Sequence, residues 1–233
     1  MGFKVRGYDK VITQEKTRDY SLFAIACEGT EREPEYFKPF NSIDRIKVDI
    51  IENEIGHRDS APKKVLERVK LYIDEVGLSE KDNDTLWCII DVDRWPRDQI
   101  EELANYCADF QNWNILISNP CFEIWLLYHK LESLDTIDCS KSQKVKDSLH
   151  KLEKGGYYFL NYLPLLQEAI CNAKKNDSNV QYYYPLPKET KVYLLGEALM
   201  KKIGKVRFNK FISEYLPMLR KCNDNLNVKK DRL

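Results

Sequence analysis

The stretch LWCIIDVDRW, residues 86–95, combines a run of apolar residues with two acidic residues. The five residues before Asp91 are all apolar or aromatic, and Asp93 follows one residue further on. A short apolar run without helical spacing of polar residues predicts a strand that is buried on both faces. Two negative charges at the end of a buried strand need positive charge nearby, so this stretch predicts a functional site as well as a strand.

Segments around this strand alternate between strand and helix patterns. Further strands are expected at residues 20–27, 45–51 and 113–118. Helices are expected at residues 34–43, 62–77, 97–111 and 120–129, where a proline suits a first turn or apolar residues line one face. Strands that alternate with helices form a mostly parallel sheet covered on both faces, so the expected fold class is α/β.

The second half of the chain has a different pattern, which is helical throughout. Helices are expected at residues 140–153, 162–175, 188–203 and 206–221. We therefore divide the chain into an N-terminal extension (1–19), an α/β domain (20–131) and a helical C-terminal region (132–233).

Composition points to a soluble globular protein, with 43% hydrophobic and 32% charged residues and no apolar run long enough to span a membrane. The chain has seven cysteines, an odd number, and no two are spaced as C-x-x-C. Most of them lie inside apolar stretches, where cysteine acts as a small hydrophobic residue. We therefore expect a reducing, cytoplasmic location and no structural zinc.

Charge is unevenly distributed, although the formal net charge is zero. Residues 201–233 hold ten Lys or Arg against three Asp or Glu, a net charge of +7, so the preceding residues carry −7. An acidic body with a basic tail suggests a polyanion or an acidic partner, and a solvated C-terminal helix is the alternative. The candidate basic residues for substrate binding are Lys201, Lys202, Lys205 and Arg207.

Acids follow two of the expected strands. Glu28 comes directly after the strand at 20–27, and Asp91 and Asp93 come after the strand that opens this section. Ligands of parallel α/β sheets bind at the carboxyl ends of the strands, so these carboxylates converge if the two strands are neighbours. Carboxylates so close together repel one another unless a cation neutralises them. A site whose ligands are all oxygen atoms favours Mg²⁺ or Mn²⁺. Such a site suits phosphoryl transfer or phosphodiester hydrolysis.

Three motifs together carry a resemblance to a known family. CEGTEREPEYF (27–37), IIDVDRW (89–95) and SNPCFEIWLLYH (118–129) resemble the RloB (AbiLii-like) family of prokaryotic defence proteins, and the likeness extends over residues 18–200. The resemblance implies a Toprim catalytic domain and a Mg²⁺-dependent endonuclease that cleaves DNA or RNA. It also implies anti-phage defence by abortive infection, together with an ABC/AAA-type ATPase partner (RloA/AbiLi-like).

The resemblance also implies roles for individual residues. Glu28 matches the Toprim glutamate, a general acid/base or metal ligand, and Asp91 and Asp93 match the metal-holding pair. Glu33 and Glu123 are further metal candidates, although Arg32 stands where the family usually has Thr before the second Glu.

Neighbouring residues are candidates for binding the substrate. Gly29 would let a substrate approach the backbone closely. Arg94 would stabilise charge on a phosphate or form a salt bridge with the acids, and Trp95 and Tyr182–Tyr184 would stack on bases or pack locally.

Two other functions fit the same residues. A D-x-D motif after an apolar strand also serves nucleotidyl or sugar-nucleotide transferases, in which the metal holds a diphosphate. These enzymes do not need a Glu-Gly pair after the first strand, so Glu28 argues against them. Alternatively, the chain is a non-catalytic docking partner of a defence ATPase, and the helical region supplies the docking surface.

Overall fold

The computed structural model of the chain describes residues 19–52, 61–79, 84–92, 95–153 and 158–222. Almost all of the expected N-terminal extension therefore lies outside the described residues, as do Asp93 and Arg94.

The centre of the molecule is a sheet of four parallel strands in the order β2-β1-β3-β4. The strands are β1 (Ser21–Cys27), β2 (Ile46–Ile51), β3 (Thr85–Asp91) and β4 (Trp113–Ser118), each within one residue of its expected bounds. β1 and β3 pair directly, with Cys27 opposite Ile89. The two strands that end on acids are therefore neighbours at the middle of the sheet.

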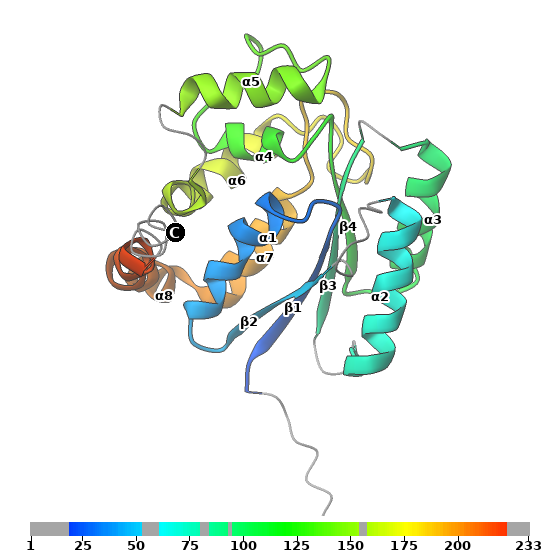
Figure 1. The fold of residues 1–233 in the computed structure, drawn as a ribbon, viewed down its shortest axis with the longest axis horizontal. Helices are drawn as coiled ribbons and strands as arrows, with labels where there is room; N and C mark the ends of the chain where they lie inside the picture. Colours follow the sequence, from blue (N-terminus) through cyan, green and yellow to red (C-terminus); the bar gives the residue numbers. More distant parts are fainter. Residues whose placement is uncertain (1–18, 53–60, 80–83, 93–94, 154–157, 223–233) are drawn as a thin grey trace, which may run out of the picture.

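One face of the sheet is covered by α2 and α3 (Figure 1). These helices are α2 (Pro62–Val76) and α3 (Arg97–Ala108). Side chains alternate across a strand, so Leu22, Ala24 and Ala26 of β1 pack against this layer while Phe23 and Ile25 pack on the other side. Because both faces are covered, β1 and β3 are apolar at nearly every position.

The opposite face is covered by the remaining helices. They are α1 (Arg32–Phe37), α4 (Glu123–Tyr128), α5 (Ser142–Leu152), α6 (Leu166–Lys175), α7 (Tyr193–Ile203) and α8 (Lys205–Lys210). Short 3-10 turns lie at Lys38–Ser42, Phe159–Asn161 and Leu163–Leu165, a π-helical turn lies at Phe211–Tyr215, and helical backbone continues over 216–222.

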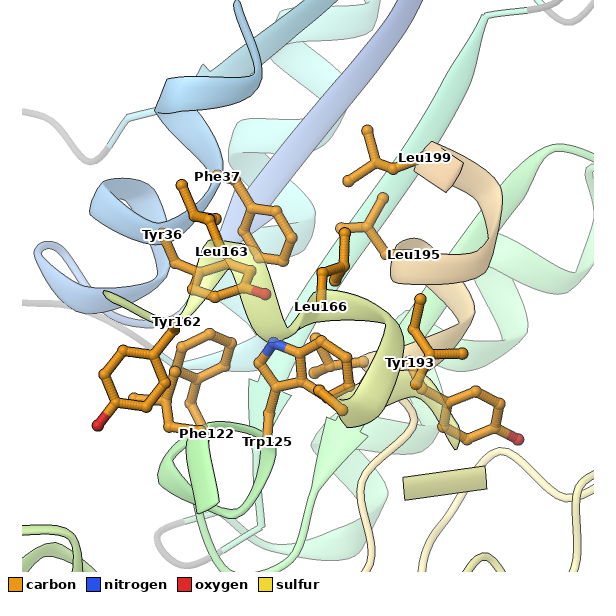
Figure 2. Close-up of a cluster of buried hydrophobic side chains, with 14 of the residues drawn as sticks. Tyr36, Phe37, Phe122, Trp125, Tyr162, Leu163, Leu166, Tyr193, Leu195 and Leu199 are labelled. Atoms are coloured by element: carbon orange, nitrogen blue, oxygen red, sulfur yellow. The ribbon is translucent and has the colours of Figure 1, made fainter. Parts of the chain in front are cut away.

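A single hydrophobic core joins this face to the helical C-terminal region. Figure 2 shows Trp125 of α4 in this cluster, with Tyr36 and Phe37 of α1 on one side and Tyr193 and Leu195 of α7 on the other. All five side chains are at most 1% exposed. The C-terminal helices therefore complete the core of the sheet, and residues on both sides of position 131 share one hydrophobic cluster.

These observations confirm the expected fold class, an α/β protein with a parallel sheet, helices on both faces and a helical C-terminal part. The arrangement is consistent with a Toprim-like domain. None of the helices in the described part of the chain has the length and apolar character that a membrane span needs.

Several helices begin later than the sequence predicts, among them α4 and α7. The helix expected at 120–129 begins at Glu123, and the helix expected at 188–203 begins at Tyr193. In the second case, residues before the helix pair with β4 instead. Thr190 forms an antiparallel bridge with Ser118, and the Lys191 N–H donates to the Ile117 carbonyl at 2.8 Å.

A buried ion pair fixes the loop before α7. The Lys191 ammonium donates to the two Asp177 carboxylate oxygens at 2.7 and 2.6 Å and to the Asn179 carbonyl at 2.8 Å. The Tyr193 hydroxyl donates to the same carboxylate at 2.7 Å. The Lys191 and Asp177 side chains are only 2% and 0% exposed, so this ion pair is as buried as the hydrophobic core.

Candidate functional site

Glu28 and Asp91 meet at the carboxyl ends of the two central strands. The Asp91 backbone N–H donates to Glu28 Oε2 at 3.0 Å, and the Glu28 N–H donates to the Ile89 carbonyl at 3.0 Å. Glu28 is only 6% exposed, and Asp91 is half-buried. The structure thus brings these two predicted residues together, while Asp93 lies outside the residues it describes.

Glu33 of α1 lies directly against Gly29. A Cβ atom on Gly29 would come within 2.2 Å of Glu33 Oε2, so only glycine permits this approach without a shift of the carboxylate. The sequence predicted that Gly29 gives space to a substrate. The structure shows that it gives space to a second buried carboxylate, which is 6% exposed.

The carboxyl of Glu33 holds its proton unusually strongly. Burial, together with the nearby charges of Glu123 and Glu28, raises its pKa from 4.5 to about 7, against the lowering effects of a backbone hydrogen bond and of Arg32. Three predicted acids, Glu28, Glu33 and Glu123, therefore interact electrostatically within one partly water-excluded region.

Glu123 is balanced by cations within the chain. It is the first residue of α4 and only 3% exposed, and its carboxylate forms an ion pair with Arg32. Lys146 Nζ lies 4.0 Å from the same carboxylate. These two cations explain how a charged residue is accommodated in an otherwise apolar helix. An acid in the first helical turn also interacts favourably with the helix dipole. Arg32, the departure from the family pattern, thus links α1 to α4.

Replacing Glu33 by glutamine is expected to stabilise the protein in a pH-dependent way. Because the folded-state pKa lies above the ordinary value, native Glu33 retains a proton that the unfolded chain releases between about pH 4.5 and 7, so its contribution to stability falls as the pH rises. The variant should therefore gain on the order of 1–3 kcal/mol in free energy of unfolding near pH 8 and little near pH 4. Urea denaturation at both pH values in EDTA measures this gain, and an equal gain at both would contradict it.

The donor set at this edge suits a hard divalent cation. Carboxylate oxygens are the ligands that Mg²⁺ and Mn²⁺ prefer, and Glu28 and Asp91 supply them at adjacent strand ends. Within the described ranges, no group of three or more His, Cys, Asp and Glu side chains is arranged around one point as a metal site. Asp93, next but one to Asp91, is outside those ranges.

His129 has a structural role in the core. Its Nε2 is hydrogen-bonded to the Tyr36 hydroxyl at 2.8 Å and its Nδ1 to the Trp125 carbonyl at 2.9 Å. Burial lowers its pKa to about 3, so the ring is neutral at physiological pH. These contacts hold α4 against α1.

The three consecutive tyrosines pack over the connection between β3 and α3. Tyr183 and Tyr184 contact the same core cluster as Trp95, and the Arg97 guanidinium lies 4.9 Å from the centre of the Tyr184 ring. The Arg97 guanidinium also donates to the Tyr182 hydroxyl, while Tyr182 remains 40% exposed. Tyr183 and Tyr184 therefore pack locally against the core.

The basic residues after position 200 lie away from the acids. Arg207 donates to the Asp44 carbonyl at 2.9 Å and to the Ile203 carbonyl at 2.7 Å. Asp44 precedes β2, so this contact lies at the amino edge of the sheet, and Figure 1 shows α8 on that side. Lys201, Lys202 and Lys205 are on the same part of the chain. The structure does not bring this predicted set to the edge that holds Glu28.

The fold and the site define an α/β protein with an acidic candidate site at the carboxyl edge of a parallel sheet. The family model of the RloB-like protein matches residues 23–199, and the chain belongs to this RloB-like family. Membership suggests a role in the RloA/RloB defence system. No curated protein and no solved structure is significantly similar to the chain. The matched residues include every predicted acid and exclude the basic residues after 200.

Proposed function

We propose that this protein is a metal-dependent nuclease that hydrolyses phosphodiester bonds of DNA or RNA in phage defence, together with an ABC/AAA-type ATPase partner. The observation that carries the proposal is the hydrogen bond from the Asp91 backbone to the Glu28 carboxylate at the ends of adjacent central strands. Membership in the RloB-like family supports the defence context.

Each acid has a role in this proposal. Asp91 and Asp93 would hold Mg²⁺ or Mn²⁺, which when bound supplies charge stabilisation at the phosphate and lowers the pKa of a water ligand. Glu28 is fixed by the Asp91 N–H and would accept the proton of the attacking water as a general base. Glu33 lies close enough to Glu28 and Glu123 for their charges to raise its pKa, and a bound cation would favour its ionised form. A transferase that uses only D-x-D has no need of Glu28 at this position.

Cleavage assays with purified protein test the proposal. Single-stranded DNA, duplex DNA and RNA are incubated with Mg²⁺, Mn²⁺ or EDTA, with and without the proposed ATPase partner. Metal-dependent cleavage of any of these substrates supports the proposal. No cleavage under all conditions, together with phage protection that persists in an Asp91→Ala strain, would contradict it and favour a docking role.

A further inference from the structure

A pocket lies beside the acidic site, at the carboxyl ends of β1 and β2. Its volume is about 190 Å³, and it is lined by Gly29, Thr30, Lys38, Ile51, Glu52 and Arg68 among others. This is much larger than the ~10–15 Å³ that a single water requires. We call it the Arg68 pocket. Because it shares Gly29 with the acidic site, a ligand in the pocket would lie next to Glu28.

Arg68 lines the pocket from α2, and one donor of its guanidinium group forms a hydrogen bond there. Its Nη2 donates to the carbonyl of Cys27, the last residue of β1, at 3.1 Å. Its Nε–H is buried and has no acceptor among the residues that the structure describes. The Arg68 side chain as a whole is half-buried and lines the pocket. The hydrogen bond to Cys27 therefore holds a cationic group at the pocket wall, where its accessible donors can meet an anion.

The charges of the pocket favour an anion. Lys38 and Arg68 are cationic, and Glu52 is the acid in the lining. Lys38 Nζ lies 3.4 Å from Glu52, but their side chains are 54% and 72% exposed, so this ion pair is weak and easily exchanged. Ile51 contributes an apolar wall. Arginine binds phosphate through a planar fork of donors, and lysine adds a mobile point charge.

We propose that the Arg68 pocket binds a phosphate group of the nucleic-acid strand, next to the phosphate that is cut. This inference rests on the proposed nuclease function and assigns it a substrate-positioning site. The acids lie between β1 and β3, whereas the pocket lies between β1 and β2, and neighbouring strands are ~4.8 Å apart. Successive phosphates of one nucleic-acid strand are separated by one flexible sugar unit, so one can lie at the acids while its neighbour lies in the pocket.

Binding of a fluorescent oligonucleotide to Arg68→Gln tests the proposal separately from cleavage. The Glu28→Gln protein is the background, so that bound strands stay intact. Loss of a charged hydrogen bond, worth about 1.5–3 kcal/mol, predicts an affinity that is ~10–100-fold weaker. The slope of log affinity against log salt concentration should also become smaller by about one. Lys63→Gln, an exposed lysine on the same helix outside the pocket, removes the same charge and should change affinity less than about twofold.

Two further arms make the result decisive. Strands with a 5′-phosphate and with a 5′-hydroxyl are compared: an equal effect of Arg68→Gln on both assigns the pocket to an internal phosphate, and an effect on the first alone assigns it to a terminal one. If Arg68→Gln melts early, Lys38→Gln replaces it. Wild-type affinity in a folded variant would overturn the inference, whatever the cleavage assays show, while Arg68-dependent binding without any cleavage would count against the nuclease proposal alone.

Discussion

Replacing Lys191 by methionine is expected to lower the free energy of unfolding by about 3–5 kcal/mol, because the Asp177 carboxylate would stay buried without its cation. Lys191 makes two hydrogen bonds to Asp177 of 2.7 and 2.6 Å and one to Asn179 of 2.8 Å, and the Tyr193 hydroxyl donates to the same acid. Methionine keeps most of the side-chain volume, so the loss reports the charge rather than a cavity.

Urea denaturation of Lys191→Met, with Lys174→Met as the control, measures this effect. Lys174 forms an ion pair with Glu197 at 2.7 Å, but the side chains are 51% and 37% exposed, so the control should lose less than ~1 kcal/mol. Replacing both partners, Lys191→Met with Asp177→Leu, should recover part of the lost stability. Equal losses in the two single variants would show that burial of the pair does not matter.

Replacing Glu28 by glutamine is expected to reduce metal-dependent cleavage by at least ~100-fold, because the variant loses a general base at the reacting phosphate. This prediction rests on the proposed nuclease function. The amide oxygen of glutamine can still accept the Asp91 N–H, so the melting temperature should be equal to or higher than that of the wild type in EDTA.

Glu31→Gln is the matched control for Glu28→Gln. Glu31 is exposed and only three residues away, so the substitution removes the same charge without touching the buried site, and cleavage should stay within about twofold of wild type. Initial cleavage rates at saturating metal separate the two variants. A Glu28→Gln rate similar to the control would remove Glu28 from the proposed mechanism.

Much of the fold is readable from the sequence because buried parallel strands have a distinct signature. The runs that became β1, β3 and β4 are apolar at nearly every position, and amphipathic helices separate them. The neighbouring position of Glu28 and Asp91 follows from the same pattern, because strand ends of a parallel sheet share one edge. The pairing of β1 with β3 confirms the condition on which that expectation depended.

Other parts of the site have no periodic signal in the sequence. Arg32 and Glu123 are 91 residues apart, and Arg68 reaches the Cys27 carbonyl across 41 residues. Lys191 belongs to a segment whose composition suits a helix, but its ammonium is held by Asp177 and its backbone pairs with β4. Long-range polar contacts of this kind override local propensity, which is why the start of α7 was predicted too early.

The core that joins α1, α4 and α7 has a consequence for synthesis of the chain on the ribosome. Phe23, Ile25 and Trp125 emerge early, but Tyr193 and Leu195, which cover the same cluster, follow roughly 70 residues after Trp125. At a synthesis rate of ~5–20 residues per second, the apolar face of the sheet stays exposed for on the order of 4–14 s before these residues are made. Nascent chains should therefore depend on chaperones during this interval, and a stalled or prematurely ended chain would be prone to aggregate.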